Sequence, residues 1–279
     1  MRFDIRPLGD ALAAEVVGFD VHRHADAETL ARLNRAWVDR VVLCFRDQEI
    51  DPPELLRLAG IFGDTVRDAL RRPEYEVEGF PTIRLLSSEH LDTLGDGKPL
   101  RIGGSWHTDH SHMPVPPRGT MLHALELPGQ GGDTCFSNQR AAYDALPESM
   151  KVRIAGLSAR HVYNSRYSPR RLAKPDAREA AALPSAVHPL ARTHPVTGRK
   201  AIYLNPVRTE CVDGMSEADS QRLLDELLEH STQARFVYRH RWRRGDVLIW
   251  DNRQALHMAL HDYPTHARRR MHRVMIAGP

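Results

Sequence analysis

Three residues, His107, Asp109 and His257, have the types and order of a metal site that performs redox chemistry. His107 and Asp109 are separated by one residue, so on a β-strand their side chains would share a face and grip one ion together. Two imidazoles and one carboxylate form the triad of non-heme Fe(II) oxygenases, which leaves coordination positions open for substrate and oxygen. The sequence therefore predicts a metalloenzyme.

Other interpretations of these residues remain open. The chain holds 16 histidines, so a chance pairing of His107 with Asp109 is possible, and a hydrogen-bonded core histidine is the alternative. Ser105 to His110 also matches the HxHxDH pattern of metallo-β-lactamases, except that Ser105 replaces the first histidine. A binding protein for small anions is a further alternative. Strand alternation predicts that His110 is structural and faces away from His107; His112 would also face away or line a pocket.

Composition indicates a globular protein. With 279 residues, 41% of them hydrophobic and 27% charged, the chain is predicted to form a single domain over 1–279. It lacks an apolar stretch long enough for a membrane span, and its first residues do not resemble a signal peptide, so we expect a cytoplasmic protein without a membrane partner. Cys44, Cys135 and Cys211 are expected to be ordinary thiols. A net charge of +3 gives no reason to expect a nucleic-acid partner.

Hydrophobic periodicity predicts many short strands with helices near the start and as insertions, which favours a β-barrel or sandwich with helical decoration. Helices are expected over 26–40, 53–62 and 216–230, the last with Ser216 as its N-cap. Strands are expected over 41–45, 82–86, 120–125, 134–136, 236–238, 247–250 and 270–276.

Short motifs are spread along nearly the whole chain: Ile5-Arg6-Pro7-Leu8-Gly9, Phe45-Arg46-Asp47-Gln48, Trp106-His107-Thr108-Asp109, Gly131-Gly132-Asp133-Thr134, Arg192-Thr193-His194-Pro195-Val196-Thr197-Gly198, Trp250-Asp251-Asn252-Arg253 and Met271-His272-Arg273. With these motifs the chain resembles the taurine / 2,4-dichlorophenoxyacetate dioxygenase family of Fe(II)- and α-ketoglutarate-dependent oxygenases. The resemblance implies a mainly β fold with helical decoration, a double-stranded β-helix (jelly-roll) that holds the metal inside one end.

The resemblance also implies site roles and cofactors. Iron would be bound by His107, Asp109 and His257, with α-ketoglutarate as co-substrate and O2 as oxidant. Thr134 and Arg269 would hold the distal carboxylate of α-ketoglutarate, and a guanidinium suits this task because it pairs with a carboxylate through two parallel charge-assisted bonds.

Arg273 resembles the family arginine that takes the anionic group of the substrate. On a regular strand, Arg269 and Arg273 would face one way and Arg268 and Arg270 the other, so the first two could each bind one anion inside the barrel. The segment between His257 and these arginines is longer than the family spacing. Arg268 and Arg270 therefore remain alternative keto-acid ligands, although a solvated basic edge fits them better.

The substrate is less defined by the sequence. Arg208 lies where taurine enzymes carry a substrate-lining aromatic, and Gly103 replaces a polar group, so taurine itself is not favoured. Residues 160–185, with Tyr163 and Tyr167, are expected to form a lid insertion whose aromatic side chains line the substrate site. We expect hydroxylation of a small anionic sulfonate, sulfate or carboxylate, followed in some cases by cleavage of the product. Desaturation or hydroxylation of a biosynthetic intermediate is the alternative, and a homo-oligomer is expected.

Overall fold

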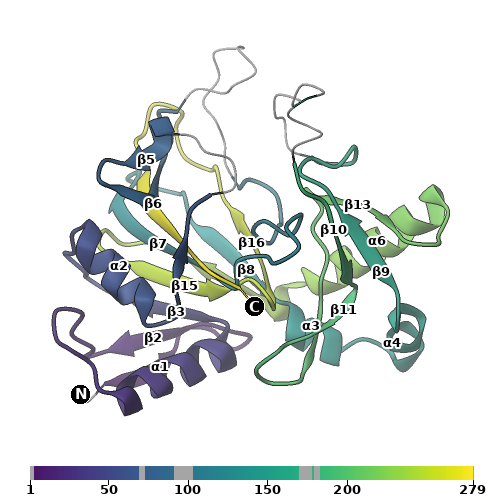
Figure 1. Ribbon diagram of the computed structural model, residues 1–279, viewed down its shortest axis with the longest axis horizontal. Coiled ribbons are helices and arrows are strands. Elements are labelled where there is room, and N and C mark those ends of the chain that lie inside the picture. The colour runs from purple at the N-terminus through teal and green to yellow at the C-terminus, as the bar shows by residue number, and fades with distance from the viewer. Residues whose placement is uncertain (1–2, 69–72, 91–102, 170–177, 179–182, 279) are drawn as a thin grey trace.

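A large sheet forms the main body of the molecule (Figure 1). The computed structural model describes residues 3–68, 73–90, 103–169, 178 and 183–278. Within these residues the sheet has the order β1-β2-β3-β15-β7-β17-β6-β5, and β4 pairs with β17. Its strands are β1 (Asp4–Pro7), β2 (Ala14–Val17), β3 (Val42–Phe45), β4 (Thr65–Val66), β5 (Glu76–Val77), β6 (Phe80–Ser87), β7 (Gly119–Glu126), β15 (Val247–Asp251) and β17 (Arg270–Ile276).

A smaller sheet packs against this body and carries one end of the candidate site. Its order is β14-β8-β16, with β14 (Val237–His240), β8 (Thr134–Asn138) and β16 (Ala255–Ala259). Phe136 of the small sheet lies 5.3 Å from Trp250 of the large one, measured between ring centroids. Apolar residues of both sheets fill the space between them, as expected for two packed β-layers.

The other face of the large sheet is covered by α1 (Ala27–Arg40) and α2 (Pro52–Gly60). Alternation along β15 explains how both faces are buried: Ile249 packs with the helices, whereas Leu248 and Trp250 pack toward the small sheet. The predicted helix that runs into a strand near residue 41 is confirmed. The second predicted helix is also present, shifted by one or two residues to Pro52–Gly60.

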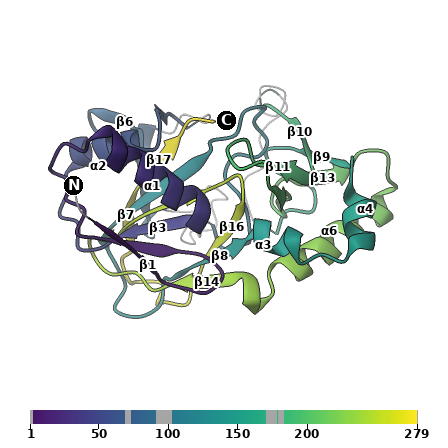
Figure 2. The same ribbon diagram turned by 90° about the horizontal axis from the view of Figure 1, so that it is seen from below.

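A second lobe lies at the opposite end of the molecule from α1 and α2 (Figures 1 and 2). Its sheets have the orders β10-β9-β13 and β11-β12. The predicted helix near 216–230 is confirmed, and the Ser216 side chain accepts a hydrogen bond from the backbone of Asp219. The lobe and its connections comprise α3 (Gln139–Asp144), α4 (Glu148–Ile154), β9 (Ser158–His161), β10 (Ala186–Pro189), β11 (Ala191–Thr193), β12 (Lys200–Ile202), β13 (Thr209–Val212), α6 (Glu217–Ser231) and the 3-10 turn Ala234–Phe236; a further 3-10 turn, Pro73–Tyr75, precedes β5.

The mainly β expectation is confirmed, and the remaining predicted strands are present as β6, β7, β8, β14, β15 and β17. Cys44, Cys135 and Cys211 are free thiols, as expected. Among the described residues, no helix has the length and apolar character that crossing a membrane requires.

Candidate metal centre

The side chains of His107, Asp109 and His257 converge at one point. The backbones of His107 and His257 form an isolated antiparallel bridge, with N–H to O=C distances of 3.0 and 2.8 Å in the two directions. His107 Nε2 lies 3.9 Å from Asp109 Oδ1, and His257 Nε2 lies 3.8 Å from Asp109 Oδ2. All three ligand atoms lie within 4.8 Å of one another, which allows them to hold one metal ion.

The predicted strand geometry for His107 and Asp109 is wrong beyond His107. Asp109 to His112 form a turn, in which His110 has a left-handed backbone with φ of 49° and its carbonyl accepts a hydrogen bond from the Met113 N–H. Alternation therefore does not apply to His110 and His112. The carboxylate reaches the imidazoles because the chain turns, while His257 is supplied by β16.

The turn is held in place by the second lobe. The side-chain amide of Asn205 donates to the Thr108 carbonyl at 2.7 Å and to Ser111 Oγ at 2.9 Å. His161 Nδ1 is hydrogen-bonded to Ser111 Oγ at 2.9 Å, and His188 Nε2 lies 2.8 Å from the Ser111 carbonyl oxygen. Since all of these groups are buried, the turn that carries Asp109 has little freedom to move.

The Asp109 carboxylate is fixed by a hydrogen bond as well. The Thr120 hydroxyl donates to Asp109 Oδ2 at 2.6 Å, and Asn252 Nδ2 donates to Thr120 Oγ1 at 2.9 Å. Burial alone would raise the pKa of Asp109, but the neighbouring His257 and His107 hold it well below its usual value. Burial, followed by the effect of His107, lowers the pKa of His257 to about 3. An ionised carboxylate and a neutral imidazole are the forms that bind a metal ion.

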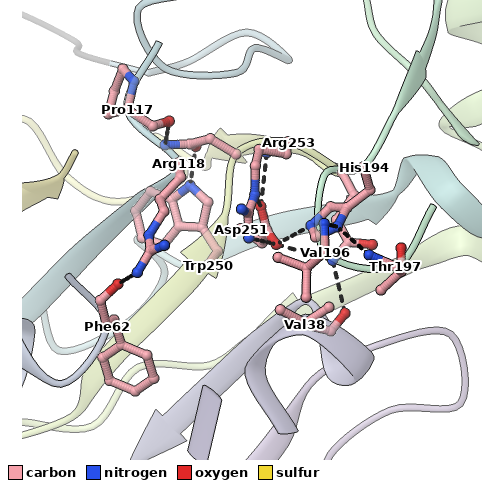
Figure 3. Close-up of polar contacts among 12 residues, drawn as sticks. Val38, Phe62, Pro117, Arg118, His194, Val196, Thr197, Trp250, Asp251 and Arg253 are labelled. Atoms are coloured by element: carbon pink, nitrogen blue, oxygen red, sulfur yellow. Dashed lines mark hydrogen bonds and ion pairs between the residues drawn. The ribbon is translucent and has the colours of Figure 1, made fainter. Parts of the chain in front are cut away.

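Behind His257, a buried network anchors the turn that joins β15 to β16 (Figure 3). Asp251 accepts hydrogen bonds from Arg253 Nε at 2.8 Å and from His194 Nε2 at 2.9 Å. His194 Nδ1 in turn accepts from the backbone N–H groups of Val196 and Thr197. Burial alone would raise the pKa of Asp251, but His194 and Arg253 lower it to about 2. The network ties the β11–β12 hairpin to the strand that precedes His257.

Arg269 contacts the Gly131–Asp133 loop, Thr134 directly follows that loop, and both have donors that fit a carboxylate ligand. Arg269 Nε donates to the Gly132 carbonyl at 3.1 Å, whereas its buried Nη2 has no hydrogen-bond partner among the described residues. Burial lowers the pKa of Arg269, although Tyr263 and Asp133 act in the opposite direction. The Thr134 hydroxyl accepts from Trp242 Nε1 at 3.0 Å and still has its own proton to donate.

The loop beside them has a backbone that suits glycine. Gly131 has φ of 77°, and a Cβ there would lie 2.6 Å from the Asp262 carbonyl oxygen. The Gly132 N–H donates to Asp262 Oδ1 at 2.8 Å. This close packing turns the Gly132 carbonyl toward Arg269, so the motif that precedes Thr134 has a direct structural reason.

The predicted alternation of the C-terminal arginines holds only in part. Arg269 precedes β17, and the register of β17 with β7 shifts between Arg270 and Met271. Arg269 and Arg273 are nevertheless both largely enclosed, whereas Arg268 is exposed and pairs with Glu89 at 3.1 Å. The solvated reading of Arg268 is therefore confirmed, while Arg270 is only half-buried.

Arg273 has a partner that the sequence reasoning missed. Its Nη2 donates to Asp68 Oδ2 at 2.6 Å, and Arg84 donates to the same oxygen. His110 Nε2 lies 3.8 Å from the other oxygen of Asp68. Burial alone would raise the pKa of Asp68, but Arg273, His110 and Arg84 lower it to about 2. Asp68 follows β4 without a motif of its own, so only the tertiary structure identifies it.

The other residues predicted to bind the substrate are Arg208, Tyr163 and Tyr167. Arg208 and Tyr163 lie together, whereas Tyr167 lies elsewhere. Arg208 is buried, with its guanidinium carbon 5.0 Å from the centre of the Tyr163 ring, and that ring lies 5.5 Å from the ring of His112. Tyr167 instead hydrogen-bonds to Glu217 on the surface of α6. The predicted lid lies partly outside the described residues and stays a prediction.

The chain was compared with known proteins, and the profile of the taurine catabolism dioxygenase TauD, TfdA family matches residues 4–275. The chain belongs to the TauD/TfdA family. A family relative of Cupriavidus pinatubonensis, an α-ketoglutarate-dependent 2,4-dichlorophenoxyacetate dioxygenase, is 34% identical over 278 residues, which cover 96% of this chain and 95% of the relative. An α-ketoglutarate-dependent sulfate ester dioxygenase of Pseudomonas putida is 32% identical over 289 residues, which cover 100% of this chain and 90% of the relative.

The solved structures agree with the family assignment. The crystal structure of AAD-2 in complex with Mn(II) and N-oxalylglycine has a TM-score of 0.84 and 30% sequence identity, and the match covers 100% of this chain and 98% of that one. The jelly-roll expectation is thereby confirmed. The TauD/TfdA chain is an α-ketoglutarate-dependent non-heme iron dioxygenase that requires Fe(II), α-ketoglutarate and O2. The metallo-hydrolase and binding-protein alternatives are not supported.

Proposed function

We propose that the enzyme hydroxylates a small organic anion, a sulfonate, sulfate ester or carboxylate, at a carbon next to a heteroatom, so that the product can split. Relatives named for 2,4-dichlorophenoxyacetate and for sulfate esters support this class, because both kinds of compound are organic anions with an oxygen bound to carbon. The single observation that carries the proposal is a pair of separate enclosed arginines, Arg269 beside Gly132 and Arg273 near Asp109 and His257, which gives separate places for two anions.

In this proposal His107, Asp109 and His257 bind Fe(II). Asp109 and His257 are already in the protonation states that a metal requires, and the hydrogen bond from the Thr120 hydroxyl would hold the Asp109 carboxylate in place for the ion. Phe136 and Trp250 pack against the ring of His257, with centroids at 6.1 and 4.6 Å, and keep water away from that side of the site. When bound, Fe(II) with α-ketoglutarate and O2 supplies the oxidising power, and α-ketoglutarate is converted to succinate and CO2.

Arg269 and Thr134 bind the distal carboxylate of α-ketoglutarate. The unused Nη2 of Arg269 and the free proton of Thr134 supply donors at a position that water or a carboxylate must fill. Leaving that guanidinium without an anion is costly because it is buried, so binding of α-ketoglutarate completes the site.

Arg273 orients the anionic group of the prime substrate, and Tyr163, Arg208 and His112 form a further wall of the substrate space. The charge of Arg273 acts on both Asp109 and His257, which supports its position beside the metal ligands. The aromatic ring of Tyr163 below the guanidinium of Arg208 offers an apolar surface next to a positive charge. A role for Tyr167 in substrate binding stays a prediction.

The test is turnover of a substrate panel by Fe(II)-loaded enzyme in air. Alkyl sulfates, alkyl sulfonates and aryloxyacetates are each supplied with α-ketoglutarate, and succinate is measured together with released sulfate, sulfite or phenol. The expected result is succinate production that rises with at least one anion and equals the amount of fragment released. Succinate formation that no anion stimulates, but that an uncharged compound does, would overturn the proposed substrate class.

The predicted homo-oligomer and cytoplasmic location belong to the same proposal. Light scattering after size-exclusion chromatography tests the first, and cell fractionation tests the second.

A further inference from the structure

Three side chains, those of Trp250, Asn252 and Thr120, form a series of hydrogen bonds that ends on the Asp109 carboxylate; we call this series the Asn252 relay. Trp250 Nε1 donates to Asn252 Oδ1 at 2.9 Å. Asn252 Nδ2 donates to Thr120 Oγ1 at 2.9 Å, and the Thr120 hydroxyl donates to Asp109 Oδ2 at 2.6 Å. All four residues are buried, so water does not compete for these bonds.

The two ends of the relay allow only one direction for its hydrogen bonds. An indole N–H can only donate, and an ionised carboxylate can only accept. Trp250 therefore requires the amide oxygen of Asn252 to face it, and the amide NH2 group faces Thr120 instead. The carbonyl of Pro117, 3.3 Å from Asn252 Nδ2, requires the same orientation. Since Thr120 Oγ1 accepts a hydrogen bond from Asn252, its own proton is directed at Asp109.

Asn252 also holds the backbone next to Asp109. It begins the turn that joins β15 to β16, and its carbonyl accepts a hydrogen bond from the Thr108 hydroxyl at 2.8 Å. Thr108 lies between the two ligands His107 and Asp109 in the sequence. The ring of Trp250, at the other end of the relay, lies 4.6 Å from the ring of His257 between centroids. The end of β15 therefore contacts both the carboxylate ligand and a histidine ligand.

We propose that Trp250, Asn252 and Thr120 are positioning residues for the metal site. The relay keeps the Thr120 proton on Asp109, so the carboxylate stays turned toward the two histidines and loses little rotational freedom when an ion binds. None of the three residues is a metal ligand. This inference rests on the part of the proposed function that gives the metal to the triad, and it does not depend on the substrate class.

Cobalt(II) is the probe, because histidine and carboxylate ligands bind it and its visible absorption reports the number of ligands without any turnover. Dissociation constants are measured by titrating the apo-protein. In Thr120→Val, which replaces the hydroxyl by a methyl group, cobalt should bind about tenfold more weakly. Thr120→Ser keeps the hydroxyl and should restore both the affinity and the wild-type spectrum. Equal affinity in wild type and Thr120→Val, or equal losses in the valine and serine variants, would overturn the proposal.

Trp250→Phe tests the far end of the relay, because it keeps an aromatic ring beside His257 but removes the N–H. Cobalt should bind about threefold more weakly, since the Asn252 amide loses one of the two groups that fix its orientation. In the Thr120→Val background the same substitution should have no further effect, because the relay is already interrupted. A loss of the same size in both backgrounds would show that packing on His257 is the cause and would remove Trp250 from the relay.

The matched control is Trp37→Phe. Trp37 is as buried as Trp250, but its Nε1 has no hydrogen-bond partner among the described residues, so this variant should bind cobalt like the wild type. Urea unfolding of each apo-protein separates positioning from stability. A purely structural role of Thr120 would lower the free energy of unfolding in Thr120→Val and leave the cobalt constant unchanged. Should Trp250→Phe fail to fold, the comparison of valine with serine at position 120 still decides.

Asp109→Ala separates this inference from the proposed function. If Asp109→Ala loses cobalt but Thr120→Val does not, the triad is the metal site and only the relay fails. If Asp109→Ala binds cobalt as tightly as the wild type, or if the wild type binds none, the assignment of the metal to the triad fails and the relay fails with it. A substrate panel that gives no oxidised anion would overturn the proposed substrate class and leave the relay standing.

Discussion

The two enclosed arginines at the C-terminal end of the chain differ in what they face. Arg269 has a buried Nη2 with no partner among the described residues, whereas Arg273 shares the carboxylate of Asp68 with Arg84. An unsatisfied guanidinium binds its ligand because the alternative is an unpaired buried donor. Arg273 already pairs with a protein carboxylate, so a substrate anion would have to share this guanidinium with Asp68. Its contribution to substrate binding therefore depends on the protein groups around it. The difference fits an obligatory co-substrate at Arg269 and a variable substrate at Arg273.

Arg269→Gln should have the largest effect on this comparison. Removing one partner of a buried charge pair should raise the KM for α-ketoglutarate about 30-fold or more, with a smaller change in the KM for the prime substrate. Steady-state kinetics with each compound varied in turn provide the measurement. Arg268→Gln is the matched control, because Arg268 is exposed and pairs with Glu89. Equal losses in the two variants would contradict the role of Arg269.

Arg273→Gln should weaken binding of the prime substrate rather than binding of α-ketoglutarate. Because Arg84 remains, the KM for the anionic substrate is expected to rise about tenfold, while the affinity for α-ketoglutarate changes little. The same kinetic assay detects both changes. A rise in the KM for α-ketoglutarate as large as that for the substrate would remove the distinction between the two arginines.

Thr134→Val tests the second residue that is proposed to bind the distal carboxylate of α-ketoglutarate. Loss of the hydroxyl removes one donor to the carboxylate and leaves Trp242 Nε1 without its acceptor, so the KM for α-ketoglutarate should rise about fivefold. Thr134→Ser, which keeps the hydroxyl, should retain near-normal affinity. If serine is as poor as valine, the methyl group rather than the hydrogen bond matters.

Asp251→Asn, in the network behind His257, should have the smallest effect on catalysis. Its main effect should be on the free energy of unfolding. The folded-state pKa of Asp251 is lowered to about 2, so its contribution to stability is present above the unfolded pKa and is lost as pH falls from about 4 to 2. Asp251→Asn should therefore cost about 2 kcal/mol at pH 7, and the difference from wild type should shrink on acidification. Urea unfolding at several pH values measures this, and a difference that does not depend on pH would contradict it.

The parts of the fold that follow local rules were predictable from the sequence. Strand β15 alternates between two buried faces, and α6 begins at a serine N-cap, so both follow from periodicity and capping. The turn at Asp109 was not predictable by the same rules, because it is set by hydrogen bonds from Asn205 and the second lobe. Periodicity consequently predicted an extended backbone at His110, where the chain turns.

The candidate site shows the same limit. The types and order of His107, Asp109 and His257 were informative because a metal restricts its ligands to few residue types. Asp68 could not be predicted as a site residue, because an acidic side chain after a short strand is usually solvated. Only its contact with Arg273 in the folded protein places it at the site.

The most direct test of the central claim, that this chain holds Fe(II) and α-ketoglutarate at the triad and Arg269, is an anaerobic titration. Fe(II) and then α-ketoglutarate are added to the apo-protein while the weak visible charge-transfer band of the chelate is recorded. The account predicts a band that saturates at low α-ketoglutarate in wild type and Arg268→Gln and at much higher concentration in Arg269→Gln. A folded wild-type protein that gives no band would contradict it.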